Sequence, residues 1–222
     1  MYALLFFLST AFANGNPETI NLINTEAQRQ STHAAAQHRF ESLSKSVVEV
    51  RNPYGYGTGT AVAYRGDKYV ITAAHVVRGI DVVTIVYNGV EHVGNVIYQD
   101  METDLAVVSI SEDADIDTYK LKKRRSDVPM GEELYYCGYP NRTSLACFKG
   151  TVSLSETDLL NIHSYAWMGA SGSLVVDSRG RAIGIVSAVE VGQFLRIPTI
   201  IEDIVWIRPL DTDLYEFLES LR

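Results

Sequence analysis

The sequence predicts an all-β protein with two sets of six antiparallel strands, a helical segment before them and a helix after them. Short runs rich in Val, Ile, Thr and Tyr recur from residue 47 onward, as in half-buried strands. Residues that favour turns separate neighbouring runs. A charged connection between residues 118 and 127 divides the runs into two groups, and six strands suffice to close one barrel.

The first group of runs lies within residues 45–118. Turn signals such as Arg65-Gly66 and Asn88-Gly89 favour hairpins between successive strands. We expect strands at residues 47–50, 60–64, 69–72, 82–87, 93–98 and 105–110.

The second group lies within residues 127–210 and is followed by a helix at 211–222. The segment 177–180 is typical of a hairpin turn. Asp211 is expected to cap the helix, whose apolar face carries Leu214, Phe217 and either Leu218 or Leu221. We expect strands at residues 134–137, 147–153, 159–163, 173–176, 182–187 and 194–201.

The N-terminal region consists of two segments that precede the strands. Residues 1–13 are apolar and end in Ala11-Phe12-Ala13, which is typical of a cleaved export signal. The run is shorter than the ~20 residues of a membrane-spanning helix, so we expect no stable span. On this interpretation the protein is periplasmic or secreted. The alternative is that residues 1–13 remain as a hydrophobic membrane anchor. Residues 14–44 form a leader in which alanines favour a helix between about 26 and 44.

Composition and charge limit the classes of partner. The chain has 222 residues, and its net charge of −8 argues against nucleic-acid binding by the whole surface. The basic run at 120–125 favours a solvated connection between the barrels, with a docking patch or a protease-sensitive loop as alternatives. Cys137 and Cys147 form a disulfide if the protein is exported and remain thiols if it is cytosolic. Two cysteines without companion histidines do not make a zinc site, and we expect no metal or cofactor.

A histidine, an aspartate and a serine occur in an order and setting that suit nucleophilic catalysis. His75 and Ser171 each lie beside small or β-prone residues, and Asp104 opens an apolar run. A serine hydroxyl is a weak nucleophile and needs a base, for which imidazole has a suitable pKa. A buried carboxylate holds the correct imidazole tautomer and stabilises the imidazolium. We prefer Asp104 to the nearby Asp100 and Glu102, because it stands at the mouth of a buried strand.

An acyl transfer also needs donors for the oxyanion of the tetrahedral intermediate. Gly169 has no Cβ, so its backbone can take unusual dihedral angles. The backbone N–H groups of Gly169 and Ser171 are the expected donors. Taken alone, each of these residues is a weak signal; their joint order carries the interpretation.

The chain resembles the trypsin/chymotrypsin-like serine proteases and is most similar to the HtrA-type branch without its PDZ domain. The resemblance covers roughly residues 45–210 and implies peptide-bond hydrolysis in a cleft between two β-barrels. It also implies a terminal helix packed on the second barrel. The matching segments are Gly57–Val62, Val70–Val77, Thr103–Val108, Gly138–Pro140, Gly150–Ser153, Gly169–Ser173 and Gly184–Ser187.

The chain departs from the family pattern beside the serine. Ala170 stands where trypsin-type zymogens usually carry an aspartate that pairs with a newly freed N-terminus. We therefore expect that activation route not to operate. Ser173 replaces the commoner glycine, and Val76 replaces the usual cysteine after the histidine.

The resemblance also implies where substrate binds. Tyr165 falls at the expected pocket floor, and Ser187, Ala188 and Val189 form one wall. No aspartate stands at the floor, so a small-to-medium apolar side chain is expected before the cleaved bond. Glu190 facing the cleft would instead favour a basic side chain.

Three alternatives to a general endopeptidase remain. An esterase or lipase would carry a Gly-x-Ser-x-Gly elbow and the order Ser, Asp, His, which this chain lacks. A catalytically silent or occluded binding protein on the same fold is the second, with the helix at 26–44 as the occluding segment. A protease that acts once on itself is the third. A protein or peptide is the expected substrate, and the oligomeric state stays open.

Overall fold

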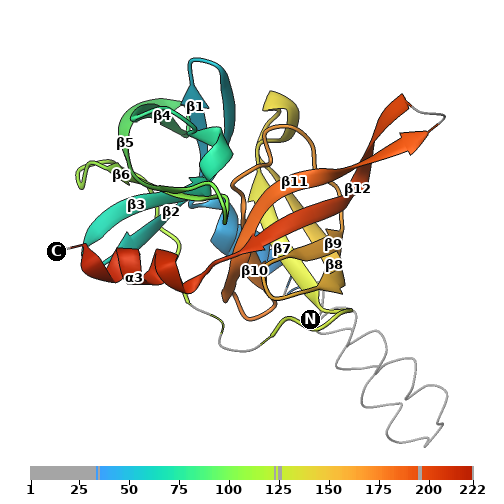
Figure 1. Ribbon diagram of the computed structural model, residues 1–222. Helices are drawn as coiled ribbons and strands as arrows, with labels where there is room; N and C mark the ends of the chain where they lie inside the picture. Colours follow the sequence, from blue (N-terminus) through green and yellow to red (C-terminus); the bar gives the residue numbers. More distant parts are fainter. Residues whose placement is uncertain (1–33, 35, 123, 125–126, 195–196, 222) are drawn as a thin grey trace, which may run out of the picture. The chain divides into compact units, whose positions relative to one another are not determined.

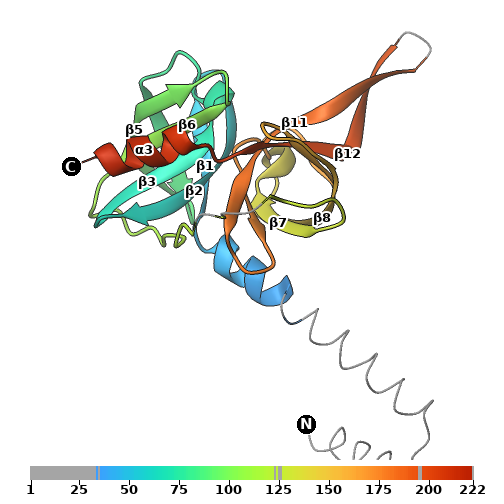
Figure 2. The same cartoon turned by 60° about the horizontal axis from the view of Figure 1, so that its bottom comes forward.

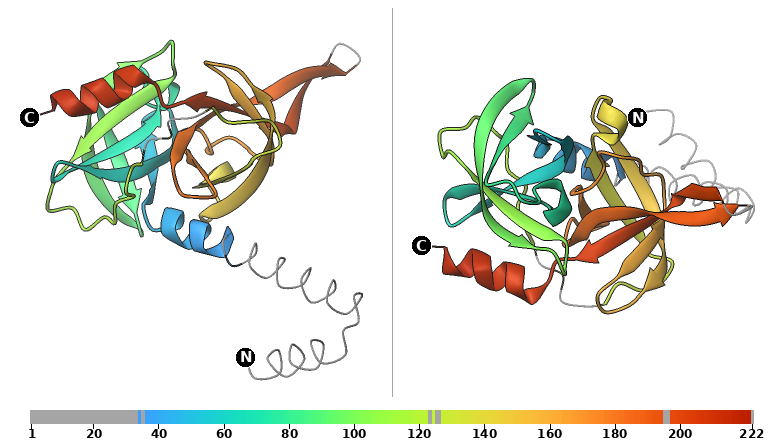
Figure 3. Two further views of the ribbon diagram at one scale, coloured as in Figure 1. Left: turned by 90° about the horizontal axis from the view of Figure 1, so that it is seen from below. Right: turned by 45° about the horizontal axis from the view of Figure 1, so that its top comes forward.

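Two closed antiparallel barrels of six strands each make up the fold of the computed structural model, which describes residues 34, 36–122, 124, 127–194 and 197–221 (Figure 1). Two further views show the barrels side by side, with the C-terminal helix beside the first barrel (Figure 3). The predicted fold class is confirmed.

The first barrel has the strand order β1-β2-β3-β6-β5-β4. Ile71, Ile85 and Leu105 are fully buried in its interior. Asn88 and Gly89 both have positive φ, which builds the tight turn that their sequence predicts. Its elements are β1 Val47–Asn52, β2 Gly55–Tyr64, β3 Asp67–Ala73, the short 3₁₀ helix η1 Ala74–Val76, β4 Val82–Tyr87, β5 Val90–Asp100 and β6 Leu105–Ile110.

The second barrel has the strand order β10-β11-β12-β9-β8-β7. Tyr136, Ile162 and Ile207 are fully buried and belong to one hydrophobic cluster. Its elements are β7 Glu133–Gly138, the short 3₁₀ helix η2 Pro140–Arg142, β8 Ala146–Ser155, β9 Leu160–His163, β10 Leu174–Asp177, β11 Ala182–Phe194 and β12 Ile197–Pro209.

Strands β11 and β12 are much longer than the predicted runs 182–187 and 194–201. Val189 pairs with Val205, but Glu190 pairs with Ile201, so three residues of β12 bulge between these two pairs. Beyond the bulge the two strands continue as a ribbon that projects from the barrel (Figure 2). Sequence propensity missed residues 188–193 of β11, where Gly192 disfavours a strand interior.

Helix α3 (Thr212–Ser220) begins at the predicted cap, because Asp211 Oδ1 accepts a hydrogen bond from Leu214 N at 2.7 Å. The expected packing on the second barrel needs correction. The ring of Phe217 lies 4.7 Å from that of Tyr98 on β5, and Arg65 donates to the Glu219 carbonyl. The ribbon view shows α3 beside β5 and β6 (Figure 2). These partners belong to the first barrel. Tyr215 of the same helix lines a cavity together with second-barrel residues such as Leu160 and Ile183.

The segment before β1 is helical over residues 36–44. Leu43 is fully buried, and the ring of Phe40 lies 5.7 Å from that of Tyr135 on β7. Residues 39–44 therefore pack on the second barrel. The expected export signal at residues 1–13 lies outside the described residues. Within the described part of the chain, no helix is long and apolar enough to cross a membrane.

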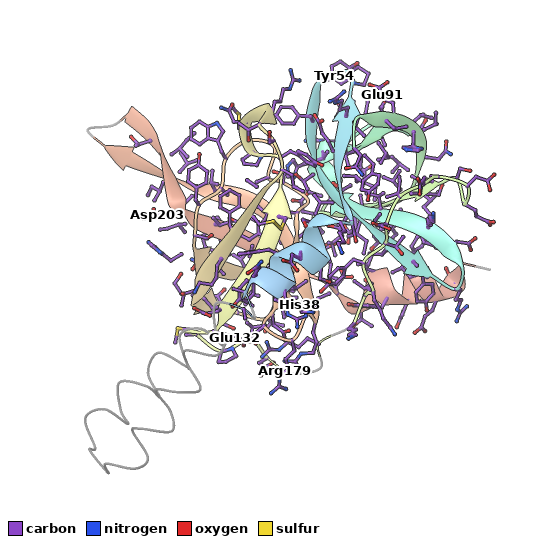
Figure 4. All side chains as sticks on the ribbon, turned by 180° about the vertical axis from the view of Figure 1, so that it is seen from behind. His38, Tyr54, Glu91, Glu132, Arg179 and Asp203 are labelled. Carbon is purple, nitrogen blue, oxygen red and sulfur yellow. A yellow bond between two sulfur atoms is a disulfide. The ribbon has the colours of Figure 1, made fainter. Side chains whose placement is uncertain are left out.

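The basic connection between the barrels is only partly solvated. Lys120 and Lys122 are exposed, as expected, but the Arg124 side chain is 9% exposed and lies 2.6 Å from Glu132 and 3.5 Å from Asp177. Asp177 is fully buried, and a buried carboxylate requires cationic partners. Figure 4 labels Glu132 and Arg179 at this end of the second barrel. Arg124 thus anchors the connection.

Candidate active site

His75 lies in η1, directly after β3, and its position is fixed by Asp104. The backbone N–H of Ala74 donates to the Asp104 carbonyl at 2.9 Å, and that of His75 donates to Asp104 Oδ1 at 3.0 Å. The His75 ring Nδ1 lies 2.9 Å from Oδ2 and 3.0 Å from Oδ1 of the same carboxylate. The imidazole is 42% exposed, so the rest of the ring stays open to a substrate.

Asp104 is a buried residue at the start of β6, with 8% of its surface exposed. Its φ of 58° lies in the left-handed region, which Asp tolerates better than most residues. The rival Asp100 accepts hydrogen bonds from Glu102 N and Thr103 Oγ1 within its own turn. The structure therefore brings Asp104, and neither Asp100 nor Glu102, to the imidazole.

The pKa of Asp104 results from opposing effects. Burial raises it, but hydrogen bonds from the His75 ring, the Ser187 hydroxyl and the His75 backbone N–H together outweigh burial. The pKa of the Asp104 carboxyl is therefore held below its ordinary value. At neutral pH the group is an ionised acceptor, which keeps a proton on His75 Nδ1.

Ser171 lies in the loop between β9 and β10, and Ser187 of β11 connects it to the other two residues. The Ser171 hydroxyl donates to the Ser187 carbonyl at 3.4 Å, while the Ser187 hydroxyl donates to Asp104 Oδ2. Within the described residues no hydrogen bond joins Ser171 to His75. Such bonds are often long before substrate binds.

The loop before Ser171 needs a glycine at position 169. Gly169 has a φ of 99°, and a Cβ there would lie 2.4 Å from both the Tyr139 carbonyl and the Tyr56 ring. Within the described part of the chain, the N–H groups of Gly169 and Ser171 donate to no acceptor. Both remain available to a ligand.

The expected substrate-binding residues have mixed surroundings. Tyr165 is 44% exposed, and its ring lies 5.6 Å from that of Phe148. Ala188 is exposed, and Val189 packs against the second-barrel core. The Glu190 carboxylate accepts a hydrogen bond from Trp206 Nε1 at 2.7 Å, so it has a partner on β12.

Sequence reasoning gave no role to Thr58, which lies beside the serine loop. Its backbone N–H donates to the Ser171 carbonyl at 2.8 Å, and its hydroxyl donates to the Gly169 carbonyl at 2.7 Å. The only signal in the sequence was its place within Gly57–Val62. Among the described residues, no group of three His, Cys, Asp or Glu side chains is arranged to hold a metal.

Comparisons with known proteins agree with this architecture. Residues 57–185 match the model of a trypsin-like peptidase domain. No curated protein sequence matches the chain.

Solved structures of proteases share the fold at low sequence identity. The inactive form of the Rv3671c protease from M. tuberculosis aligns with a TM-score of 0.65 and 19% identity, over 83% of this chain and 93% of that one. A serine endoprotease from Yersinia pestis aligns with a TM-score of 0.67 and 21% identity, over 82% of this chain and 66% of that one. A human pathogenic astrovirus serine protease aligns with a TM-score of 0.59 and 20% identity, over 76% of this chain and 91% of that one.

Proposed function

The chain belongs to the trypsin-like peptidase family and is a serine-type peptidase, and we propose that His75, Asp104 and Ser171 form its catalytic triad. One observation carries the proposal: the buried Asp104 carboxylate contacts both the backbone and the ring of His75. Ser187 then links this pair to Ser171. We infer an endopeptidase that acts on proteins or peptides.

The proposed reaction proceeds through an acyl-enzyme. His75 Nε2 takes the proton from Ser171 Oγ as that oxygen attacks the substrate carbonyl. Asp104 stabilises the imidazolium, and the N–H groups of Gly169 and Ser171 bind the oxyanion. The imidazolium then gives its proton to the leaving amine as the C–N bond breaks. A water molecule, deprotonated by His75, hydrolyses the ester and restores Ser171.

The apolar residues around the expected substrate-binding segments support a preference for a small-to-medium apolar side chain before the cleaved bond. Phe148 and Val189 are partly buried hydrophobic residues packed on the second-barrel core. The Glu190 carboxylate is already hydrogen-bonded to Trp206, which reduces its value as a partner for a basic substrate side chain. Profiling with a peptide library tests this preference, and cleavage mainly after Lys or Arg contradicts it.

Export is part of the proposal. Cys137 and Cys147 are joined in a disulfide, and such bonds persist mainly in oxidising compartments. This agrees with an export signal at residues 1–13. Localisation of the tagged full chain, with and without residues 1–13, tests this part, and equal export of both forms contradicts it.

Peptide hydrolysis by variants of the full chain tests the triad. Ser171→Ala and His75→Ala should each reduce kcat by about 10⁶-fold, and Asp104→Asn by about 10⁴-fold. Asp100→Asn is the matched control, because that nearby carboxylate does not contact His75, and it should stay within a few-fold of wild type.

Two outcomes would contradict the triad. Full activity in Ser171→Ala would remove the proposed nucleophile. A folded wild type with no hydrolytic activity would favour the alternative of a catalytically silent binding protein on the protease fold.

A further inference from the structure

Every carbonyl group of the loop 167–171 accepts a hydrogen bond. Backbone N–H groups satisfy some of them, and side-chain hydroxyls satisfy others: those of Tyr56 and Thr58 on β2, and that of Ser173 just after the loop. The bonds are Ala170 N to Trp167 O at 3.0 Å, Asn141 N and Tyr56 Oη to Met168 O at 2.6 and 3.2 Å, Thr58 Oγ1 to Gly169 O at 2.7 Å, Ser173 N and Oγ to Ala170 O at 3.1 and 2.7 Å, and Thr58 N to Ser171 O at 2.8 Å.

These bonds set the directions of the two proposed oxyanion donors. A trans peptide is planar, so its N–H points away from its C=O. Holding the Met168 carbonyl therefore fixes the Gly169 N–H, and holding the Ala170 carbonyl fixes the Ser171 N–H. The peptide between them carries the Gly169 carbonyl. The orientation of that peptide sets ψ of Gly169 and φ of Ala170, two of the torsion angles that relate the flanking N–H groups to each other.

Thr58 holds that middle peptide from the opposite barrel. Its side chain is fully buried on β2, and its hydroxyl donates to the Gly169 carbonyl while accepting from Tyr139 N at 3.0 Å. Its own carbonyl accepts from Thr72 Oγ1 at 2.7 Å. The N–H, the carbonyl and the hydroxyl of Thr58 therefore all have hydrogen-bond partners, and these partners hold the hydroxyl in one orientation.

The packing around Thr58 leaves little room for the loop to move. A Cβ added at Gly172 would lie 2.1 Å from the Thr58 carbonyl oxygen, and one added at Gly138 would lie 2.9 Å from its hydroxyl oxygen. Ala170, the residue before the serine, has no carboxylate with which to anchor the loop. The side chains that anchor the carbonyls of this loop act through hydroxyls.

We propose that Thr58 is a positioning residue for the oxyanion donors, acting through its hydrogen bond to the Gly169 carbonyl. The inference rests on the proposed peptidase function. Because the hydroxyl holds the donors in place before substrate arrives, its loss should weaken binding of the transition state more than binding of the substrate.

Three threonine variants of the full chain test the proposal. Thr58→Val keeps the shape and removes the hydroxyl, and it should lower kcat by about 10–100-fold with little change in KM, somewhat less than the loss of a whole oxyanion donor. Thr58→Ser keeps the hydroxyl and should restore most of kcat. Thr60→Val is the matched control, since Thr60 is also fully buried on β2 and its hydroxyl has no partner among the described residues.

Binding of a peptide aldehyde gives a second readout that a merely structural role would not move. The aldehyde forms a hemiacetal with an active serine, and its oxygen occupies the oxyanion site. Its affinity should fall in Thr58→Val in parallel with kcat, while the affinity for a non-covalent product peptide stays unchanged. If Thr58→Val does not fold, Thr58→Cys replaces it with the same expectation, because a thiol is a weak donor of similar size.

The outcomes separate this inference from the proposed function. Wild-type kcat and aldehyde affinity in a folded Thr58→Val protein, with only a lower unfolding free energy, would overturn the positioning role while leaving the triad intact. An equal loss of kcat in Thr60→Val would also overturn it. Failure of the wild type to react at Ser171 would instead defeat the peptidase mechanism itself.

Discussion

At the residue scale, Ser187 connects the two halves of the proposed triad. Its hydroxyl donates to Asp104 Oδ2 from the first barrel, and its carbonyl accepts from the Ser171 hydroxyl of the second. The first of these bonds helps to keep the Asp104 carboxylate ionised despite its burial. The second holds the Ser171 side chain when no substrate is bound.

Removing the Ser187 hydroxyl should change stability in a pH-dependent way. A carboxyl group whose pKa is depressed by folding stabilises the protein above its unfolded pKa of about 3.9, and this contribution is lost as pH falls through the lower folded value. Ser187→Ala should therefore lower the unfolding free energy by about 1–3 kcal/mol at pH 7. The difference should shrink as pH falls below about 4.

Denaturant unfolding across pH 2–8 measures this effect. Ser178→Ala, in the exposed turn between β10 and β11, is the control and should match wild type throughout. A destabilisation by Ser187→Ala that stays constant down to pH 2 would show that the hydroxyl does not act through the Asp104 carboxylate.

At the level of single residues, the sequence is informative where the signal is local. The apolar run after Asp104 distinguished it from Asp100, and the structure places it against His75. Thr58 could not be recognised this way, because its hydroxyl contacts Gly169, 111 positions later in the chain. Nothing in the residues around Thr58 indicates that contact.

At the element scale, a disulfide closes the hairpin that supports the serine loop. Cys137 of β7 and Cys147 of β8 are directly opposed, with 4.0 Å between their Cα atoms. The enclosed turn carries Asn141, whose N–H donates to the Met168 carbonyl. The sequence left the redox state of these cysteines open, and the structure shows them joined.

Breaking this disulfide should destabilise the protein by about 2–3 kcal/mol, because a short loop is released in the unfolded state. Adding dithiothreitol should lower the Tm of wild type and leave that of the Cys137→Ser/Cys147→Ser variant unchanged. Equal Tm values for oxidised wild type and the variant would show that the bond does not contribute to stability.

Strand prediction failed at one pair of elements. The other ten strands overlap their predicted runs, although β2 begins five residues before its run, since alternation and turn residues are local signals. The ribbon of β11 and β12 beyond the bulge depends on five register pairs, including Gly192 with Thr199. Cross-strand pairing outweighs the weak intrinsic preference of such residues.

At the scale of the whole molecule, function depends on how the two barrels meet. The first barrel carries His75 and Asp104, and the second carries Ser171. Their contact includes the bond from Thr58 N to the Ser171 carbonyl and that from Tyr139 Oη to the Val47 carbonyl at 3.5 Å. The sequence predicts each barrel from its strand pattern, whereas the interface between them arises from contacts distant in sequence.

The central claim is that Ser171 is an activated nucleophile. Intact-mass and peptide mass spectrometry of the full chain after treatment with a fluorophosphonate test it most directly, because the reagent phosphonylates an activated serine with loss of fluoride. We predict one adduct on Ser171 in wild type and in Asp100→Asn, and none in Ser171→Ala or His75→Ala. An adduct on another residue, or none on folded wild type, would contradict the account.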